Sequence, residues 1–242
     1  MNDLIRVGIV GAAGYTAGEL IRLLLNHPAV EIIFAHSESN AGNAITDVHA
    51  GLYGETDIRF TDQLAFDEID VVFFCFGHGK STQFLAEHYI PADVRIIDLA
   101  QDFRLIGDDN DYIYGLPELN LLQLQGAQHV ANPGCFATCI QLGLLPLAAE
   151  GLLEGDIMVN AITGSTGAGV KPAATTHFSW RSGNMSIYKS NSFIIGVIFE
   201  FLSNVFNKVS KIVLIIGGVF YRERVGFTLH PTHTFNLYVI VF

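Results

Sequence analysis

A glycine-rich turn that directly follows a short apolar run is the feature that most constrains the fold. The run Val7-Gly8-Ile9-Val10 is typical of a buried strand, and the turn Gly11-Ala12-Ala13-Gly14 comes next. Leucines then recur at helical spacing over residues 16–26, and Pro28 ends the helical pattern. This order predicts the first unit of a parallel sheet with a dinucleotide-type turn. The open alternative is an ordinary glycine-rich connection between a strand and a helix.

More apolar runs alternate with helical patterns as far as residue 134. We expect strands at residues 31–35, 70–76, 94–99 and 129–131, and a helix at residues 81–88. These strands are continuously apolar, which is typical of strands buried on both faces of a sheet. The sequence therefore predicts an α/β fold, with a Rossmann-type doubly wound parallel sheet over residues 1–134.

The pattern changes after residue 134. Residues 158–163 alternate like a strand and residues 164–169 form a glycine-rich loop, so we predict an incomplete second α+β domain, the catalytic and substrate domain, at 135–189. Residues 190–242 carry a net charge of +2, against −13 for residues 1–189, and hold 8 of the 18 Phe. We therefore interpret residues 190–242 as a divergent apolar tail. Its apolar runs, at 193–206 and 212–221, are too short to span a bilayer.

Charge and cysteine usage limit the partners and the compartment. The net charge of −11 argues against a nucleic-acid-binding surface, which needs basic patches. The 3 cysteines have no disulfide-framework spacing, which fits a reducing cytosol. The first residues enter a strand without the charged and apolar regions of a signal peptide. We expect a cytoplasmic protein that binds neither nucleic acid nor membrane.

A cysteine stands where a helix is expected to begin. Asn132-Pro133-Gly134 precede Cys135, and an apolar run of helical length, residues 136–147, follows. The positive end of a helix dipole and its free N–H groups favour the thiolate, so Cys135 is the predicted nucleophile. The open alternative is an inert buried thiol. We expect Cys139 to be a packed core residue, because its spacing from Cys135 is not that of a redox pair and no further metal ligands cluster nearby.

Several segments are candidates for holding a dinucleotide. The pyrophosphate is expected on the first turn and the helix start, at Gly11, Ala13, Gly14, Tyr15 and Thr16. Cofactor choice is expected at the end of the second strand, where Ser37 and Ser39 favour the 2′-phosphate of NADP and Glu38 is a counter-argument. Gly77 and His78 follow the third strand and are expected near the cofactor, or alternatively form a simple connection. Residues 1–134 are thus predicted to bind NADP.

Arg104 follows another predicted strand. Its guanidinium is a candidate to bind a phosphate or carboxylate bidentately. The open alternative is a salt bridge to Asp98 or Asp102.

Five segments together resemble the N-acetyl-γ-glutamyl-phosphate reductases of arginine biosynthesis. The resemblance runs from Val7 to about Lys189. The matching segments are residues 11–20, 98–105, Tyr114-Gly115-Leu116-Pro117-Glu118-Leu119-Asn120, Asn132-Pro133-Gly134-Cys135 and Gly164-Ser165-Thr166-Gly167-Ala168-Gly169.

The resemblance implies a Rossmann domain, a second α/β domain, NADPH as cofactor and a homo-oligomer. It also implies that Cys135 attacks the γ-acyl phosphate and that hydride transfer to the thioacyl enzyme yields the semialdehyde. Arg104, Ser165 and Gly167 are the implied substrate contacts. The residues themselves give no reason to expect a metal site.

The chain departs from this pattern after Lys189. The family uses a catalytic His shortly after that position, whereas this chain has no His between His177 and His230. We therefore hypothesise a divergent, truncated tail on an otherwise intact reductase. Two alternatives stay open: an inactive NADP-binding remnant, and an enzyme similar to aspartate-semialdehyde dehydrogenase, against which the segment from Tyr114 to Asn120 speaks.

Overall fold

The computed structural model describes residues 4–105, 107, 110–184, 186–190, 209–218, 227–229 and 234–241. The chain divides into two compact units, Met1–Pro133 and Gly134–Phe242. We propose domain boundaries at residues 134 and 189.

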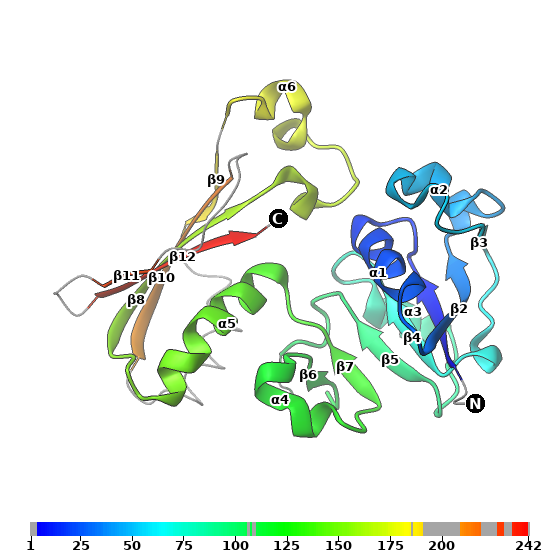
Figure 1. The fold of residues 1–242 in the computed structure, drawn as a ribbon, viewed down its shortest axis with the longest axis horizontal. Coiled ribbons are helices and arrows are strands. Elements are labelled where there is room, and N and C mark those ends of the chain that lie inside the picture. Colours follow the sequence, from blue (N-terminus) through cyan, green and yellow to red (C-terminus); the bar gives the residue numbers. More distant parts are fainter. Residues whose placement is uncertain are drawn as a thin grey trace. The chain divides into compact units, whose positions relative to one another are not determined.

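The first unit is built on a parallel sheet of seven strands (Figure 1). The strands are β1 (Ile5–Val10), β2 (Val30–His36), β3 (Phe60–Thr61), β4 (Val71–Phe74), β5 (Arg95–Asp98), β6 (Ile113–Tyr114) and β7 (His129–Ala131). Their order is β3-β2-β1-β4-β5-β7-β6, and each neighbouring pair is parallel. The strand order reverses between β1 and β4, and the carboxyl ends of strands at such a switch point form the ligand crevice of doubly wound sheets. The predicted Rossmann-type fold is confirmed.

Helices connect these strands. They are α1 (Tyr15–Leu25), α2 (Ile45–Val48), α3 (Ser81–Glu87) and α4 (Pro117–Leu124), with short 3-10 turns η1 (Glu38–Asn40), η2 (Ala50–Leu52) and η3 (Phe66–Glu68). Proline suits the first position of α4, where its missing N–H costs no helical hydrogen bond.

Both faces of the sheet are buried, which explains the continuous apolar strands. On one face Val7 and Ile9 pack with Ile21 of α1 and Ile45 of α2. On the other face an aromatic cluster forms, in which Phe74 lies edge-on to Phe84 at a centroid distance of 5.3 Å. Alternate residues of one strand therefore enter different cores.

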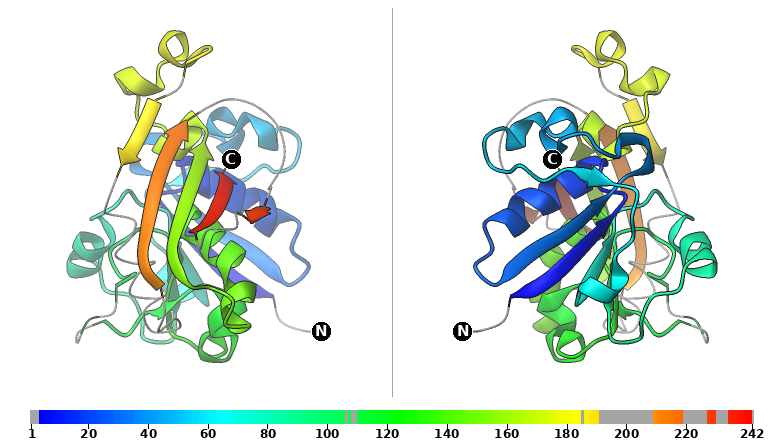
Figure 2. Two further views of the ribbon diagram at one scale, coloured as in Figure 1. Left: turned by 90° about the vertical axis from the view of Figure 1, so that its left-hand side faces the viewer. Right: turned by 90° about the vertical axis from the view of Figure 1, so that its right-hand side faces the viewer.

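The second unit consists of a mixed five-stranded sheet and helix α5 (Cys135–Ala149). Strand β8 (Gly155–Thr163) pairs in parallel with β10 (Val209–Gly218) and β12 (Thr234–Val241). Strands β9 (Ser186–Ser190) and β11 (Phe227–Leu229) pair antiparallel with β10 and β12. Figure 2 shows β8 between its two parallel neighbours. Between β8 and β9 lie η4 (Ser165–Ala168), η5 (Ala174–Thr176) and α6 (Phe178–Arg181).

The predicted tail contributes strands to this sheet. Strand β10 begins before the apolar run predicted at 212–221 and ends at Gly218 within it, whereas the run at 193–206 lies outside the described residues. In the described part of the chain, no helix combines the length and the apolar character that crossing a membrane requires.

Candidate active site

The turn after β1 and the segment after β4 meet at the switch point of the sheet. Gly11 has a φ of 79°, and a Cβ there would lie 2.8 Å from the carbonyl oxygen of Cys75. A side chain at this position would therefore require both a left-handed backbone and a shift of the neighbouring segment. The structure thus brings the predicted turn next to the segment that leads to Gly77 and His78.

Helix α1 begins directly after this turn. Gly14 is its N-cap residue, and no side chain caps the helix within the described residues. The first helical bond is donated by the N–H of Gly18 to the carbonyl of Gly14, at 3.0 Å. The N–H groups of Tyr15 and Thr16 thus precede the helical hydrogen bonds, and with the dipole they suit an anion. Tyr15 itself is half-exposed.

The end of β2 separates the two predicted serines. Ser37 is buried and Ser39 is exposed, and the amide of Asn40 donates to both hydroxyl oxygens, at 3.1 and 3.0 Å. His36 is also buried, and burial lowers the pKa of its imidazole. The lowered pKa disfavours a positive charge on His36, so a 2′-phosphate at this strand end would depend on the serine hydroxyls rather than on the imidazole.

Two loops at the carboxyl edge are joined by Asp102. Its carboxylate accepts from the N–H of Gly79 at 2.8 Å and from both the N–H and the hydroxyl of Thr82 at 3.2 Å. The N–H of Gln101 donates to Nδ1 of His78 at 3.2 Å. Because Nδ1 accepts, a neutral His78 carries its proton on Nε2. These bonds hold the Gly77–His78 loop against the segment after β5.

The Asp102 network gives a pH-dependent prediction. Burial opposes ionisation, but the hydrogen bonds from Gly79 and Thr82 lower the pKa of Asp102 overall. A lowered folded-state pKa contributes stability above the unfolded value, near 3.8, and this stability is lost as the pH falls through the folded value. Asp102→Ala is expected to lower the unfolding free energy by about 1 kcal/mol at pH 7. Chemical denaturation should show this difference shrinking below about pH 4.

Asp93→Ala is the control, because Asp93 is an exposed carboxylate of the same unit. A difference between wild type and Asp102→Ala that stays constant from pH 7 to pH 2 would contradict the assignment.

Asp98 and Cys75 are buried beneath this edge. Oδ1 of Asp98 accepts from the Ser81 hydroxyl at 2.7 Å and from the N–H of Ala100 at 3.0 Å. Burial nevertheless raises the pKa of Asp98, and burial raises the pKa of the Cys75 thiol to about 12. Cys75 is therefore an inert thiol at neutral pH.

Arg104 binds backbone carbonyls of two segments. Its Nε donates to the carbonyl of Asn132 at 2.8 Å and its Nη2 to that of Leu99 at 2.6 Å. The N–H of Asn132 also donates to the carbonyl of Asp98 at 2.8 Å. Arg104 thus secures the segment that leads to Cys135, a contact that neither the predicted substrate role nor the salt-bridge alternative anticipated.

Cys135 is the first residue of α5, as the sequence predicted. Gly134 is the N-cap residue, and its carbonyl accepts from the N–H of Thr138 at 2.9 Å and from the Thr138 hydroxyl at 3.1 Å. Cys135 is exposed, whereas Cys139 is half-buried. Burial, with Cys135 nearby, raises the pKa of Cys139. The exposed thiol is therefore the one at the helix start.

The other predicted substrate contacts lie in the second unit. Ser165 opens the turn η4 after β8, and the N–H of Gly167 donates to the carbonyl of Gly164 at 3.3 Å. Gly167 is exposed and Ser165 is partly exposed. In the described residues, no three His, Cys, Asp or Glu side chains are grouped to hold a metal ion.

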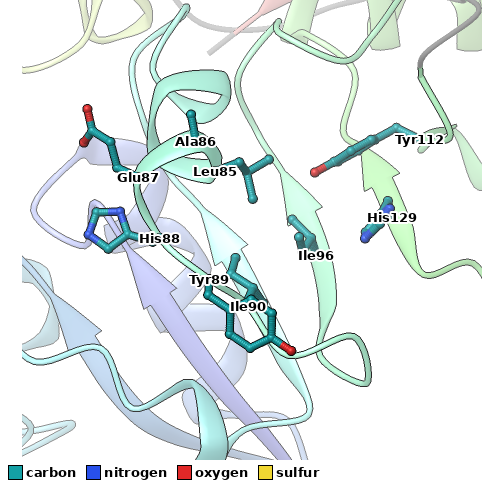
Figure 3. A pocket seen from close by; sticks show the side chains of 9 residues that line it. All are labelled: Leu85, Ala86, Glu87, His88, Tyr89, Ile90, Ile96, Tyr112 and His129. Atoms are coloured by element: carbon teal, nitrogen blue, oxygen red, sulfur yellow. The ribbon is translucent and has the colours of Figure 1, made fainter.

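A hollow of about 510 Å³ lies elsewhere on the first unit (Figure 3). Ile96 and His129 line it from the first halves of β5 and β7. Tyr112 stacks on His129 with a distance of 5.0 Å between the ring centroids. These positions lie away from the strand ends that carry the predicted cofactor residues. Within the first unit, the hollow is therefore separate from the predicted cofactor residues.

Comparison with known proteins places the chain in a family. A family model described as the NAD-binding domain of semialdehyde dehydrogenase matches residues 6–127, about half of the 242 residues. The chain belongs to the semialdehyde dehydrogenase family. A second model, described as the semialdehyde dehydrogenase dimerisation domain, matches residues 135–193.

Relatives within this family carry a more specific name. N-acetyl-gamma-glutamyl-phosphate reductases of Bacteroides thetaiotaomicron and Phocaeicola vulgatus are both 68% identical to the chain, over 187 and 186 residues. Each match covers 77% of this chain and 58% of the relative, so the chain spans less than two thirds of the length of these relatives. The matched lengths of 187 and 186 residues agree with a resemblance that ends near Lys189.

Solved structures of aspartate semialdehyde dehydrogenases share the fold. An aspartate semialdehyde dehydrogenase with NADP from Candida albicans has a TM-score of 0.66 at 16% identity, covering 91% of this chain and 69% of that one. A Vibrio cholerae aspartate semialdehyde dehydrogenase II has a TM-score of 0.65 at 19% identity, covering 90% and 71%.

Proposed function

We propose that this chain is an NADPH-dependent reductase of N-acetyl-γ-glutamyl phosphate, which it converts to N-acetylglutamate 5-semialdehyde. The observation that carries the proposal is the exposed Cys135 at the first position of α5. The 68% identity to reductases of that name supports this substrate over that of the aspartate semialdehyde dehydrogenases, which are 15–19% identical.

In the proposed reaction the Cys135 thiolate attacks the acyl carbon, and the carbon–oxygen bond to phosphate breaks. Inorganic phosphate leaves and a thioester remains on Cys135. When bound, the nicotinamide supplies the hydride that reduces the thioester carbonyl. The resulting thiohemiacetal takes up a proton and collapses, which releases the aldehyde and restores the thiol.

The residues of the first unit fit a dinucleotide. Gly11 leaves no room for a side chain, and the start of α1 presents backbone N–H groups at Tyr15 and Thr16. Gly14 and Ala13 would allow the pyrophosphate to approach the backbone closely. Gly77 and His78, on the adjoining loop, would border the cofactor.

We assign the 2′-phosphate of NADP to the end of β2. The exposed Ser39 would meet the phosphate, while Ser37 would support Ser39 through their shared bonds to Asn40. Ser39→Asp is expected to weaken NADP⁺ binding about tenfold, because a carboxylate would face the phosphate. The affinity for NAD⁺, which lacks that phosphate, should change less than about threefold. Titration calorimetry with both nucleotides measures the difference; equal losses would contradict the assignment.

Arg104, Ser165 and Gly167 are the proposed substrate contacts, with Arg104 also holding the Asn132 carbonyl. The match to a dimerisation domain supports a homo-oligomer. We propose a cytoplasmic location, in keeping with free thiols.

The reverse reaction tests this function. N-acetylglutamate semialdehyde, NADP⁺ and phosphate should yield NADPH at a rate that depends on phosphate. NADP⁺ binding without any such turnover would instead favour an inactive NADP-binding remnant. The absence of a His between residues 177 and 230 is the feature that favours this second candidate.

A further inference from the structure

A histidine of the first unit reaches the glycine turn from outside it. His49 lies between α2 and η2, and its Nε2 is 2.8 Å from the carbonyl oxygen of Ala12. Because a carbonyl only accepts, Nε2 is the donor in this bond. Ala12 is fully buried inside the turn that follows β1, 37 residues earlier in the chain.

The same ring fills the space beside Gly18 of α1. A Cβ on Gly18 would lie 2.6 Å from Nδ1 and 2.9 Å from Cε1 of His49. The ring also packs near Phe60, at a centroid distance of 6.1 Å. Figure 1 shows α2 beside α1. The ring can therefore move only if it loses its bond to Ala12 or its contact with α1.

The bond from His49 completes the hydrogen bonding of Ala12. The N–H of Ala12 donates to the carbonyl of His36 at 2.9 Å, so β2 holds one side of the residue and His49 the other. Two residues further on, the N–H of Gly14 donates back to the carbonyl of Gly11 at 3.3 Å. Fixing Ala12 thus fixes the course of the backbone from Gly11 to Gly14.

We propose that His49 is a positioning residue for the dinucleotide. It acts through the Ala12 carbonyl, holding the turn so that the N–H groups at the start of α1 face the pyrophosphate. This inference rests on the proposed function, because it takes the turn to be the cofactor site. If His49 has this role, cofactor affinity depends on a hydrogen-bond donor at residue 49 and not only on the space that the ring fills.

Two variants of the full chain separate the donor from the volume. His49→Gln places an amide N–H where it can reach the Ala12 carbonyl, whereas His49→Leu fills space without a donor. We expect the Kd for NADP⁺ to rise about fivefold to tenfold in His49→Leu and less than about twofold in His49→Gln, since one net hydrogen bond is at stake. Calorimetric titration measures Kd, and a denaturation curve of each variant separates affinity from stability.

Gly18→Ala tests the same contact from the helix. The added methyl should displace the ring and weaken NADP⁺ binding to about the same extent as His49→Leu. In a His49→Ala background the methyl meets no ring, so Gly18→Ala should cause no further loss of affinity. If Gly18→Ala weakened NADP⁺ binding as much in the His49→Ala background as in the wild type, the inference would be overturned.

Amide hydrogen exchange without cofactor makes the test independent of the proposed function. The N–H groups of Ala12 and Gly14 should exchange faster in His49→Leu than in His49→Gln. Equal exchange, or equal Kd values in the Gln and Leu variants, would overturn the positioning role. A wild-type chain that binds no NADP⁺ would contradict the proposed function instead, and the exchange measurement would still decide whether His49 orders the turn.

Discussion

Replacing Cys135 with Ser is expected to lower the rate of phosphate-dependent NADPH formation by about 10⁴-fold or more, the scale on which loss of a catalytic nucleophile acts. A serine hydroxyl at the start of α5 is far less acidic than a thiol, so it supplies almost no anion at neutral pH. The helix itself should persist, because serine is well accepted near a helix start. Steady-state rates with saturating semialdehyde and NADP⁺ measure the effect.

Cys139→Ser is the matched control for this prediction. Cys139 lies one helical turn further along α5, is half-buried, and has a pKa raised by burial. We expect its replacement to change the rate by less than about threefold, although partly burying a hydroxyl in place of the thiol costs some stability. A large loss of rate in Cys139→Ser with little loss in Cys135→Ser would identify Cys139 as the nucleophile and contradict the prediction.

Thiol labelling checks the same assignment without activity. Brief treatment of the folded chain with iodoacetamide should modify Cys135 first, because Cys135 is exposed whereas Cys75 is buried. Peptide mapping identifies the labelled residue. Preferential labelling of Cys75 would contradict the described burial.

Gly11→Ala is expected to destabilise the first unit by about 2–4 kcal/mol and to abolish NADP⁺ binding. Two effects add at this position: alanine is strained at a φ of 79°, and its Cβ would lie 2.8 Å from the Cys75 carbonyl oxygen. The clash is with backbone, so a side-chain rotation cannot relieve it. Chemical denaturation and nucleotide titration measure the two losses.

Two other glycines separate these effects. Gly42 also has a positive φ, of 84°, but a Cβ there meets nothing within 4 Å, so Gly42→Ala should cost only about 1–2 kcal/mol of strain. A Cβ on Gly14 meets its nearest atom at 3.6 Å, an ordinary contact. Gly14→Ala should therefore fold normally and still lose affinity for NADP⁺, if the pyrophosphate lies against that backbone. Unchanged affinity in Gly14→Ala would contradict this placement of the cofactor.

Much of the first unit could be predicted from the sequence because its strands are buried on both faces. A run such as residues 71–74 contains only Val and Phe, and alternate residues enter the two cores, so no polar residue interrupts it. The predicted strand at 70–76 was nevertheless too long by three residues. The apolar pattern continues through Cys75 and Phe76, but the pairing with β1 and β5 ends at Phe74.

Features that depend on long-range contacts could not be predicted from the sequence. Strands β3 and β6 have two residues each, too few for any periodicity to appear. Arg104 and His49 both bind backbone carbonyls, and a carbonyl acceptor leaves no mark on the identity of the residue that carries it. Gly18 was the one available signal for His49, because a glycine inside a helix indicates a close neighbour.

The pairing of β10 and β12 with β8 was also missed. The change in charge and in Phe content after Lys189 set residues 190–242 apart, but both strands are apolar and of ordinary length. Composition does not reveal which strand such a segment will pair with, because main-chain groups make the ladder.

Trapping the acyl group tests the central claim most directly. The full chain is incubated with N-acetylglutamate semialdehyde and NADP⁺ in a phosphate-free buffer, so that the acyl enzyme has no phosphate to accept the acyl group. Mass spectrometry of the acid-quenched protein should show one N-acetylglutamyl group in thioester linkage on the peptide that contains Cys135, and added phosphate should remove it. An unmodified Cys135 after NADPH has formed, or an acyl group on Cys139 instead, would contradict covalent catalysis at the start of α5.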